Sequence, residues 1–363
     1  MSTRAQRLQA LLPQEDNGMP VDGALIVSGA NRRYLTGFPS SAGYVLVTRE
    51  QAWFLVDFRY YEAASKNATG CQVVMFHRVE DTLAQLIKEH HIRGVLFESE
   101  GMTLAQAAWM EQILASQGAQ AVKTGTLDSL LWQLRMYKTQ EEIACIKEAQ
   151  RITEEAFEQV LPLIQEGVTE RELALQIEMG MRRRGAEGVA FDLIVVAGAK
   201  GSLCHGVPDD NQVHRGDFIT MDIGARVNGY NSDMTRTVAL GHVSEEQRKV
   251  YNIVLQAQQL GIAAAKPGAV CGDVDKVVRD YIYNAGYEGY FGHGTGHAVG
   301  LEIHESPRFS IGMKTVLAPG MVMTVEPGIY LPDRFGVRIE DMVAITEDGC
   351  EDLTNEPKEL IEL

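Results

Sequence analysis

The sequence predicts an α/β domain over residues 1–134, followed by a second domain over residues 135–363 that contains an internal duplication. Two observations support this fold class. The first part of the chain alternates apolar, strand-like runs with segments of helical pattern, which is typical of α/β proteins. The second part contains glycines and a strand motif that recur at a nearly constant spacing, which is typical of duplicated half-domains.

The strand-like runs of the first domain are short and are separated by polar or glycine-containing segments. These runs occupy residues 24–29, 43–48, 52–57, 71–76 and 94–99. A helical pattern at residues 81–91 lies between the last two runs. This order predicts a partly parallel or mixed sheet. We find no complete set of metal-binding or nucleophilic residues in this half of the sequence.

The domain boundary is predicted near residues 134–138, because helix-start signals follow it. A capping box places Ser or Thr three residues before Glu or Gln at the beginning of a helix. Such boxes begin at Thr139, Thr169 and Ser244. The first of them opens an amphipathic segment that we expect to extend to about Gln165.

The second domain repeats part of its own pattern. Three glycines recur later in the chain at one constant offset; the pairs are Gly167 with Gly268, Gly185 with Gly286, and Gly188 with Gly289. Residues 215–225 also align with residues 319–329, which places Asp222 on Glu326. The duplication predicts two similar half-domains that face each other across a pseudo-twofold axis, with a site between them.

Residues 291–305 concentrate three histidines among glycines. His293, His297 and His304 lie in this stretch, FGHGTGHAVGLEIHE. A helix is unfavourable here because each glycine costs about 1 kcal/mol relative to alanine inside a helix. We therefore expect an extended or looped segment in which the backbone can approach a ligand closely.

Five residues of the second domain have the right chemistry for a two-metal site. They are Asp222, Asp233, His297, Glu326 and Glu340. Four carboxylates and one imidazole suit Mn, Co, Fe or Zn ions. Two divalent cations balance the four carboxylate charges, whereas one would leave net negative charge in a poorly solvated cleft.

The local sequence around these carboxylates supports the same interpretation. Asp222 and Asp233 flank a turn-like segment, so they could face each other across a hairpin. Glu326 precedes Pro-Gly, which should end a strand at the carboxylate. Arg338 and Glu340 are two residues apart in a strand pattern, so we expect them on one face. Each residue also has a simpler interpretation. An aspartate before a glycine can be an ordinary turn residue, and Glu326 before Pro-Gly can be an ordinary loop residue. Arg338 and Glu340 can form a surface ion pair of little energetic value.

Composition limits the classes of partner. The chain has 49 acidic and 33 basic residues and a net charge of −16, which argues against nucleic acid or an anionic membrane. No signal-peptide pattern is evident at the beginning of the sequence, and no apolar run approaches the roughly 20 residues of a spanning helix. The five cysteines are scattered, which favours free thiols and a cytoplasmic location.

Several motifs together carry a family resemblance. They are MDIGA at 221–225, NSDMTRT at 231–237, HGTGHAVGLEIHE at 293–305, VEPGIY at 325–330 and VRIED at 337–341. The second domain resembles the pita-bread metallopeptidases, which include methionine aminopeptidase, Xaa-Pro aminopeptidase and Xaa-Pro dipeptidase (prolidase). The first domain resembles the creatinase/prolidase N-terminal domain that simple methionine aminopeptidases lack.

The resemblance implies a pita-bread α+β catalytic domain and assigns roles to single residues. Asp222 would chelate one metal ion, Asp233 and Glu340 would bridge both ions, and His297 and Glu326 would complete the second. Residues that match the substrate pocket of the proline-specific branch are His205, His293, His304 and Arg338, with Tyr330 nearby. The resemblance further implies two divalent ions, most favourably Mn with Co, Zn or Fe as alternatives, and a homodimer.

The expected reaction is hydrolysis of short peptides that carry proline at the second position. A hydroxide held between the two ions would attack the carbonyl carbon before proline. His304 would help to stabilise the oxyanion, and Glu326 would carry the proton to the proline nitrogen. We place His293 with these two residues in the catalytic set.

Other functions of the same fold remain open from the sequence. One is removal of N-terminal methionine, a second is a metal-free amidinohydrolase of the creatinase type, and a third is a non-enzymatic peptide-binding module. The complete ligand set weighs against the last two. The sequence leaves open whether the substrates are dipeptides only or also longer peptides, and which metal is used.

Overall fold

The computed structural model describes residues 2–363, which form two compact units that divide between Arg135 and Met136. The helices of the first unit are α1 (Arg4–Leu11), α2 (Gly29–Thr36), α3 (Phe58–Asn67), α4 (Val79–Glu89), α5 (Leu104–Ser116) and α6 (Thr126–Met136). Within residues 2–363, no helix is both long and apolar enough to cross a membrane.

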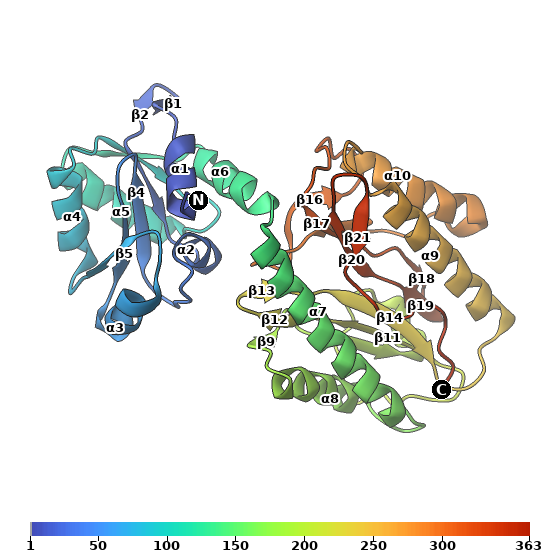
Figure 1. The fold of residues 1–363 in the computed structure, drawn as a ribbon. Helices are drawn as coiled ribbons and strands as arrows, with labels where there is room; N and C mark the ends of the chain where they lie inside the picture. Colours follow the sequence, from blue (N-terminus) through green and yellow to red (C-terminus); the bar gives the residue numbers. More distant parts are fainter. Residues whose placement is uncertain (1) are drawn as a thin grey trace. The chain divides into compact units, whose positions relative to one another are not determined.

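A six-stranded sheet forms the centre of the first unit (Figure 1). Its strands are β3 (Gly23–Ile26), β4 (Tyr44–Thr48), β5 (Ala52–Val56), β6 (Gln72–Met75), β7 (Gly94–Phe97) and β8 (Gln120–Val122), in the order β6-β5-β4-β3-β7-β8. The pairs β3–β4 and β4–β5 are antiparallel, and the other three pairs are parallel. The predicted mixed sheet is therefore confirmed. A short hairpin, β1 (Glu15–Asp16) and β2 (Met19–Pro20), precedes it.

Four long helices belong to the second unit, and α7 packs beside α8 as α9 packs beside α10. Their bounds are α7 (Gln140–Val160), α8 (Glu170–Arg183), α9 (Glu245–Ala264) and α10 (Cys271–Ile282). The predicted caps at Thr139, Thr169 and Ser244 all accept a hydrogen bond from the backbone three residues on. Helix α7 ends at Val160 and not near Gln165: the chain continues as a tighter 3-10 turn over Leu161–Leu163, in which Pro162 has no backbone N–H to continue the α-helical hydrogen bonds.

The strands of the second unit are antiparallel throughout. One sheet contains β10 (Ile194–Ala197), β11 (Phe218–Ile223) and β14 (Met234–Ala239). A five-stranded sheet contains β15 (Gly296–Ala298), β16 (Glu305–Phe309), β17 (Val322–Val325), β20 (Asp341–Ile345) and β21 (Cys350–Asp352). Shorter pairings join β9 (Gly188–Val189), β12 (Ala225–Val227) and β13 (Tyr230–Asn231), and also β18 (Gly328–Leu331) and β19 (Phe335–Arg338).

The predicted duplication is visible in the order of elements. Two helices, α7 and α8, precede β10, β11 and β14, and two helices, α9 and α10, precede β15, β17 and β20. Two of the three matched glycine pairs share their backbone conformation, with φ of 87° at Gly167 and 85° at Gly268. Gly185 and Gly286 match in the same way, at 100° and 94°. These positive φ values require glycine, which is why the repeat is readable in the sequence. The third pair differs, because Gly289 has φ of 84° whereas Gly188 lies in the strand β9 without a positive φ.

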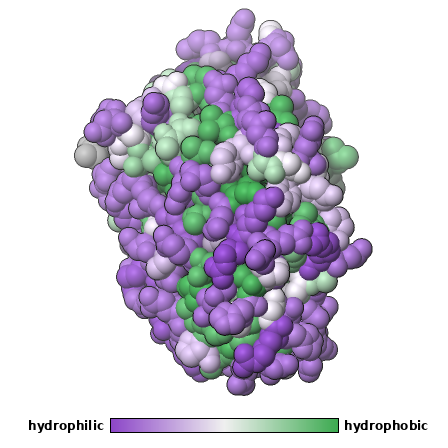
Figure 2. All heavy atoms as spheres, turned by 90° about the vertical axis from the view of Figure 1, so that its right-hand side faces the viewer, coloured by the Kyte–Doolittle hydropathy of each residue, from purple (hydrophilic) through white to green (hydrophobic). Residues whose placement is uncertain are grey.

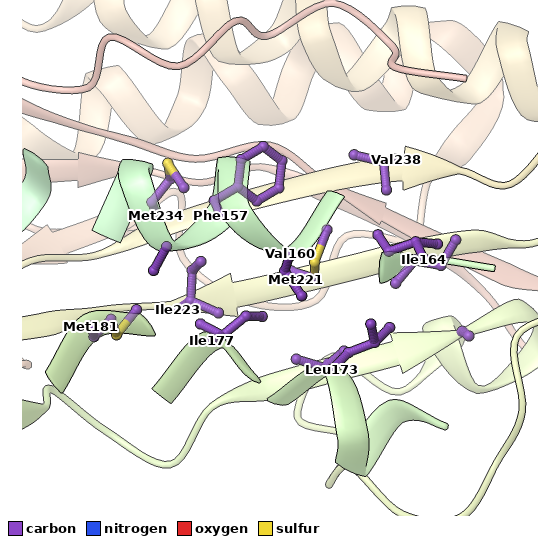
Figure 3. Close-up of a cluster of buried hydrophobic side chains, with 14 of the residues drawn as sticks. Phe157, Val160, Ile164, Leu173, Ile177, Met181, Met221, Ile223, Met234 and Val238 are labelled. Atoms are coloured by element: carbon purple, nitrogen blue, oxygen red, sulfur yellow. The ribbon is translucent and has the colours of Figure 1, made fainter. Parts of the chain in front are cut away.

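The core of the first half-domain explains how its strands are held. Phe157 and Val160 of α7 and Ile177 of α8 pack against Met221 of β11 and Val238 of β14 (Figure 3). All are almost fully buried. This apolar layer fixes the helical face of the sheet, so the ends of β11 and β14 can present carboxylates. Figure 2 shows one outer face, on which hydrophobic side chains form patches between hydrophilic ones.

Candidate metal centre and substrate cavity

Asp222 and Asp233 reach the site from two paired strands. Asp222 lies near the end of β11, opposite Thr235 of β14, and Asp233 immediately precedes β14. The connection between these strands is more complex than one hairpin. Its Asn228–Gly229 turn closes β12 against β13, with φ of 49° and 82° as a two-residue hairpin turn requires.

The second half-domain supplies the other three predicted ligands. His297 lies in β15, in the extended chain that its glycines predicted. Glu326 follows β17 directly and Pro327 ends that strand, also as predicted. Glu340 does not continue the strand of Arg338, because β19 ends at Arg338 and β20 begins at Asp341. Its side chain nevertheless reaches the site from this connection.

The five predicted ligands line one cavity and lie close together. Ligand atoms of Asp233, His297 and Glu340 lie within 4.8 Å of one another, and all three residues are buried. The Nε2 atom of His297 is 3.5 Å from both Asp233 Oδ2 and Glu326 Oε1. Asp222 lies on the wall of the same cavity, and its Oδ2 accepts a hydrogen bond from the Arg338 guanidinium over 2.6 Å.

Burial and mutual repulsion shift the protonation of this cluster. The pKa values of Asp233 and Glu340 are raised well above their usual values by burial and then by the neighbouring carboxylates. Burial, with repulsion from Asp222, raises the pKa of Glu326 to about 7. Burial, followed by the proximity of His304, lowers the pKa of His297 to about 3, so its imidazole is neutral at pH 7.

These residues fit a divalent cation. Asp222 Oδ1 is buried and has no hydrogen-bond partner within residues 2–363, which is costly for a carboxylate oxygen unless a cation faces it. The neutral His297 imidazole and the clustered oxygens are donors that Mn, Co, Fe and Zn accept. A cation would also offset the repulsion that raises the carboxyl pKa values.

Neighbouring residues hold His297 and Glu340 in position. Thr235 donates its hydroxyl to Glu340 Oε2 over 2.6 Å, and Thr324 accepts from the backbone N–H of His297 over 3.0 Å. Arg236 is almost completely buried and donates to the Glu340 carbonyl oxygen over 2.7 Å. Its guanidinium also donates to Asp341 Oδ1 over 2.8 Å. The sequence alone indicated no role for these residues, although Thr235 and Arg236 lie inside the motif at 231–237.

The cavity has a volume of about 870 Å³, and its lining comes entirely from the second unit. Four residues predicted to contact substrate line it, namely His205, His293, His304 and Arg338. The His304 ring packs edge-on against His297, with 4.5 Å between ring centroids. His293 Nε2 lies 2.9 Å from the hydroxyl of Tyr330, which is therefore placed behind the cavity wall.

The catalytic unit matches a known family. Residues 144–347 match the model of metallopeptidase family M24, and residues 4–137 match the creatinase/prolidase N-terminal domain. The chain belongs to metallopeptidase family M24. The prediction of a metallo-exopeptidase in the branch of Xaa-Pro aminopeptidases and Xaa-Pro dipeptidases is confirmed, as are the N-terminal domain type and the pita-bread catalytic fold.

Similar M24 proteins span the whole chain. The Xaa-Pro dipeptidase of Pyrococcus furiosus is 40% identical over 357 residues, which cover 98% of this chain and 99% of that protein. The structure of the Xaa-Pro dipeptidase from Bacillus anthracis is 41% identical, with a TM-score of 0.93 and 99% of each chain covered. The X-Pro aminopeptidase from Thermotoga maritima is 35% identical, with a TM-score of 0.88 and 94% and 98% coverage.

Two positively charged side chains of this M24 cavity were missed in the sequence. The side chains of Arg171 in α8 and Arg308 in β16 are exposed and line the cavity. Arg308 is the cross-strand partner of His297, but sequence spacing alone gave no sign of that register. Arg338, by contrast, is only 3% exposed, and its guanidinium donates to protein atoms.

Proposed function

We propose that this M24 peptidase hydrolyses the Xaa-Pro bond at the N-terminus of short peptides or dipeptides, using two divalent ions. The observation that carries the proposal is the buried group of Asp233, His297 and Glu340 on the wall of a cavity large enough for a short peptide. Relatives named as Xaa-Pro dipeptidases and an X-Pro aminopeptidase support the choice of bond.

The proposed ligand assignment follows the five clustered residues. Asp222 would hold one ion, Asp233 and Glu340 would be shared by both ions, and His297 and Glu326 would complete the second position. Divalent ions bound there supply a hydroxide nucleophile near neutral pH and polarise the substrate carbonyl. The free α-amino group of a peptide would bind at this metal centre, which limits cleavage to the first residue.

Glu326 and His304 are proposed to act on the reacting atoms. Because Glu326 lines the cavity with its Oε1 3.5 Å from His297 Nε2, its carboxyl group is placed to accept and return a proton beside the reacting atoms. It would deliver that proton to the proline nitrogen, which has no hydrogen of its own. Burial, and then the charge of Arg308, lowers the pKa of His304, so its neutral ring can donate an N–H to the developing oxyanion.

The substrate's carboxylate requires a cation or a donor in the cavity. Arg338 is less suited to bind the substrate carboxylate than its place in the motif indicated. Its side chain is buried and already donates hydrogen bonds to Asp222, Tyr330 and Thr235. His205 and the side chains of Arg171 and Arg308 are exposed on the cavity wall. We propose that these residues face the carboxyl end of the peptide.

The test is hydrolysis by the Mn-loaded protein with and without a chelator. Substrates are Ala-Pro, Met-Pro, Ala-Pro-Ala and Met-Ala-Ala. Cleavage of the dipeptides alone would identify a dipeptidase, and cleavage of Ala-Pro-Ala would identify an aminopeptidase. Cleavage of Met-Ala-Ala alone, or of none, would contradict the proposal. On the basis of the family resemblance, we also propose that the ion is manganese and that the protein is a homodimer. Metal analysis tests the first proposal, and analytical ultracentrifugation tests the second.

A further inference from the structure

One buried carboxylate closes the base of a loop that lines the cavity. Glu170 is the first residue of α8 and is fully buried. It accepts four hydrogen bonds, from Ala197 N at 2.8 Å, Lys200 Nζ at 2.6 Å, Asp209 N at 3.3 Å and Asn211 Nδ2 at 2.8 Å. No other part of the proposed mechanism uses this carboxylate.

The four donors lie at the two ends of one loop, residues 198–208. Ala197 ends β10 before the loop, and Asn211 follows it. The backbone reinforces the second end, because the N–H of Glu170 donates to Asn211 O over 3.0 Å. The second half of the loop, residues 204–208, lines the cavity and carries the exposed His205.

The helix that begins at Glu170 forms another wall of the same cavity. The lining residues of α8 are Arg171, Ala174, Leu175 and Glu178. Their spacing of three and four residues places them on one helical face. Glu170 therefore connects α8 with the loop 198–208 through hydrogen bonds. Because both segments line the cavity, the distance between them determines the space available for a peptide side chain.

We propose that Glu170 is a positioning residue that sets the separation between α8 and the loop 198–208, and thereby the size of the side chain accepted in the cavity. The proposal rests on the peptidase function proposed above. A carboxylate can accept from all four donors, whereas a glutamine presents an NH₂ group to two of them. Those two donors then lose their partner, and the loop base opens.

Glu170→Gln is the direct test, with Glu172→Gln as its matched control. Glu172 lies two residues further along the same helix, and its side chain is exposed. For Glu170→Gln we expect KM for Ala-Pro to rise about tenfold, because the displaced loop no longer holds His205 against the substrate. We expect kcat within about twofold, unchanged metal stoichiometry, and a smaller preference for Ala-Pro over Phe-Pro. Glu172→Gln should behave as wild type.

Amide hydrogen exchange over residues 198–208 gives a readout that does not need catalysis. It should be faster in Glu170→Gln than in the control. Lys200→Met removes one donor from a partly exposed position and tests the same clamp if Glu170→Gln fails to fold. Unchanged exchange and unchanged KM in the folded variants would overturn the proposal, as would loss of metal binding with unchanged KM. If wild-type protein cleaves no peptide, the peptidase function fails, while hydrogen exchange still decides whether Glu170 holds the loop.

Discussion

Arg338 donates to Asp222 Oδ2 over 2.6 Å, so one of the five proposed metal ligands is also the partner in a buried ion pair. The same guanidinium donates to the Tyr330 hydroxyl over 3.0 Å and to Cys204 O over 3.1 Å. Arg338 therefore connects the Asp222 carboxylate with the loop that carries His205. The pair gives Asp222 a fixed position before any cation is present.

We expect Arg338→Met to destabilise the metal-free protein and to impair catalysis. Removing one partner of a buried ion pair costs about 3–5 kcal/mol, because the other charge stays buried. We therefore expect denaturant unfolding in chelator to show a loss of about this size, and kcat/KM to fall at least about a hundredfold. Arg338→Lys should recover little, since an ammonium lacks the planar fork of donors. Arg334→Met, on the exposed end of the same hairpin, should leave both quantities near wild type.

Asp233→Ala should abolish the binding of two ions and, with it, peptide hydrolysis. Asp233 lies within 4.8 Å of the ligand atoms of both His297 and Glu340, so its loss removes a shared position. Metal analysis after dialysis, together with Ala-Pro hydrolysis, provides the measurement. Asp273→Ala, on the exposed first turn of α10, is the control. Full activity of Asp233→Ala in metal-free buffer would exclude the two-metal arrangement.

His304→Ala should lower kcat far more than it weakens metal binding. The His304 ring faces the cavity and packs on His297, but it is not in the group of potential ligands. Removing a donor to a developing oxyanion costs about 10²–10³-fold in kcat in other hydrolases. Calorimetric metal titration and steady-state kinetics separate the two effects. His242→Ala, at an almost fully exposed position, is the control, and an unchanged kcat in His304→Ala would remove His304 from the catalytic set.

The sequence predicted most of the fold and the clustering of the site, for identifiable physical reasons. Glycines with positive φ recur in both half-domains, and Pro327 ends the strand at Glu326, so local rules were sufficient there. The supporting contacts are different. Arg236 donates a hydrogen bond to Glu356 O, 120 residues further along the chain, and no local sequence pattern predicts a contact between residues so far apart. The burial of Arg338 was missed for the same reason.

The raised carboxyl pKa values predict that metal affinity increases with pH. Glu326 has a pKa of about 7 in the metal-free folded protein, and those of Asp233 and Glu340 are also raised. Metal binding requires the carboxylates to lose their protons, so it should release protons near neutral pH. Calorimetry of Mn binding in buffers of different ionisation enthalpy measures that release. No proton release at pH 7 would contradict the prediction.

The same shifts predict that these carboxyl groups lose their contribution to the stability of the metal-free protein as pH rises. A carboxyl group with a raised folded pKa holds its proton more tightly in the folded state. Its contribution to stability is present below the unfolded value of about 4.3 and is lost as pH rises through the folded value. For Glu326 that loss lies between about pH 4 and pH 7. His293 and His297, whose pKa values are lowered to about 4 and about 3, act in the opposite direction over the same range, so the contribution of Glu326 has to be isolated with Glu326→Gln in chelator. The Tm of Glu326→Gln minus the Tm of wild type should increase from about pH 4 to about pH 7, because only wild type loses this contribution. A difference that did not change with pH would contradict the raised pKa of Glu326.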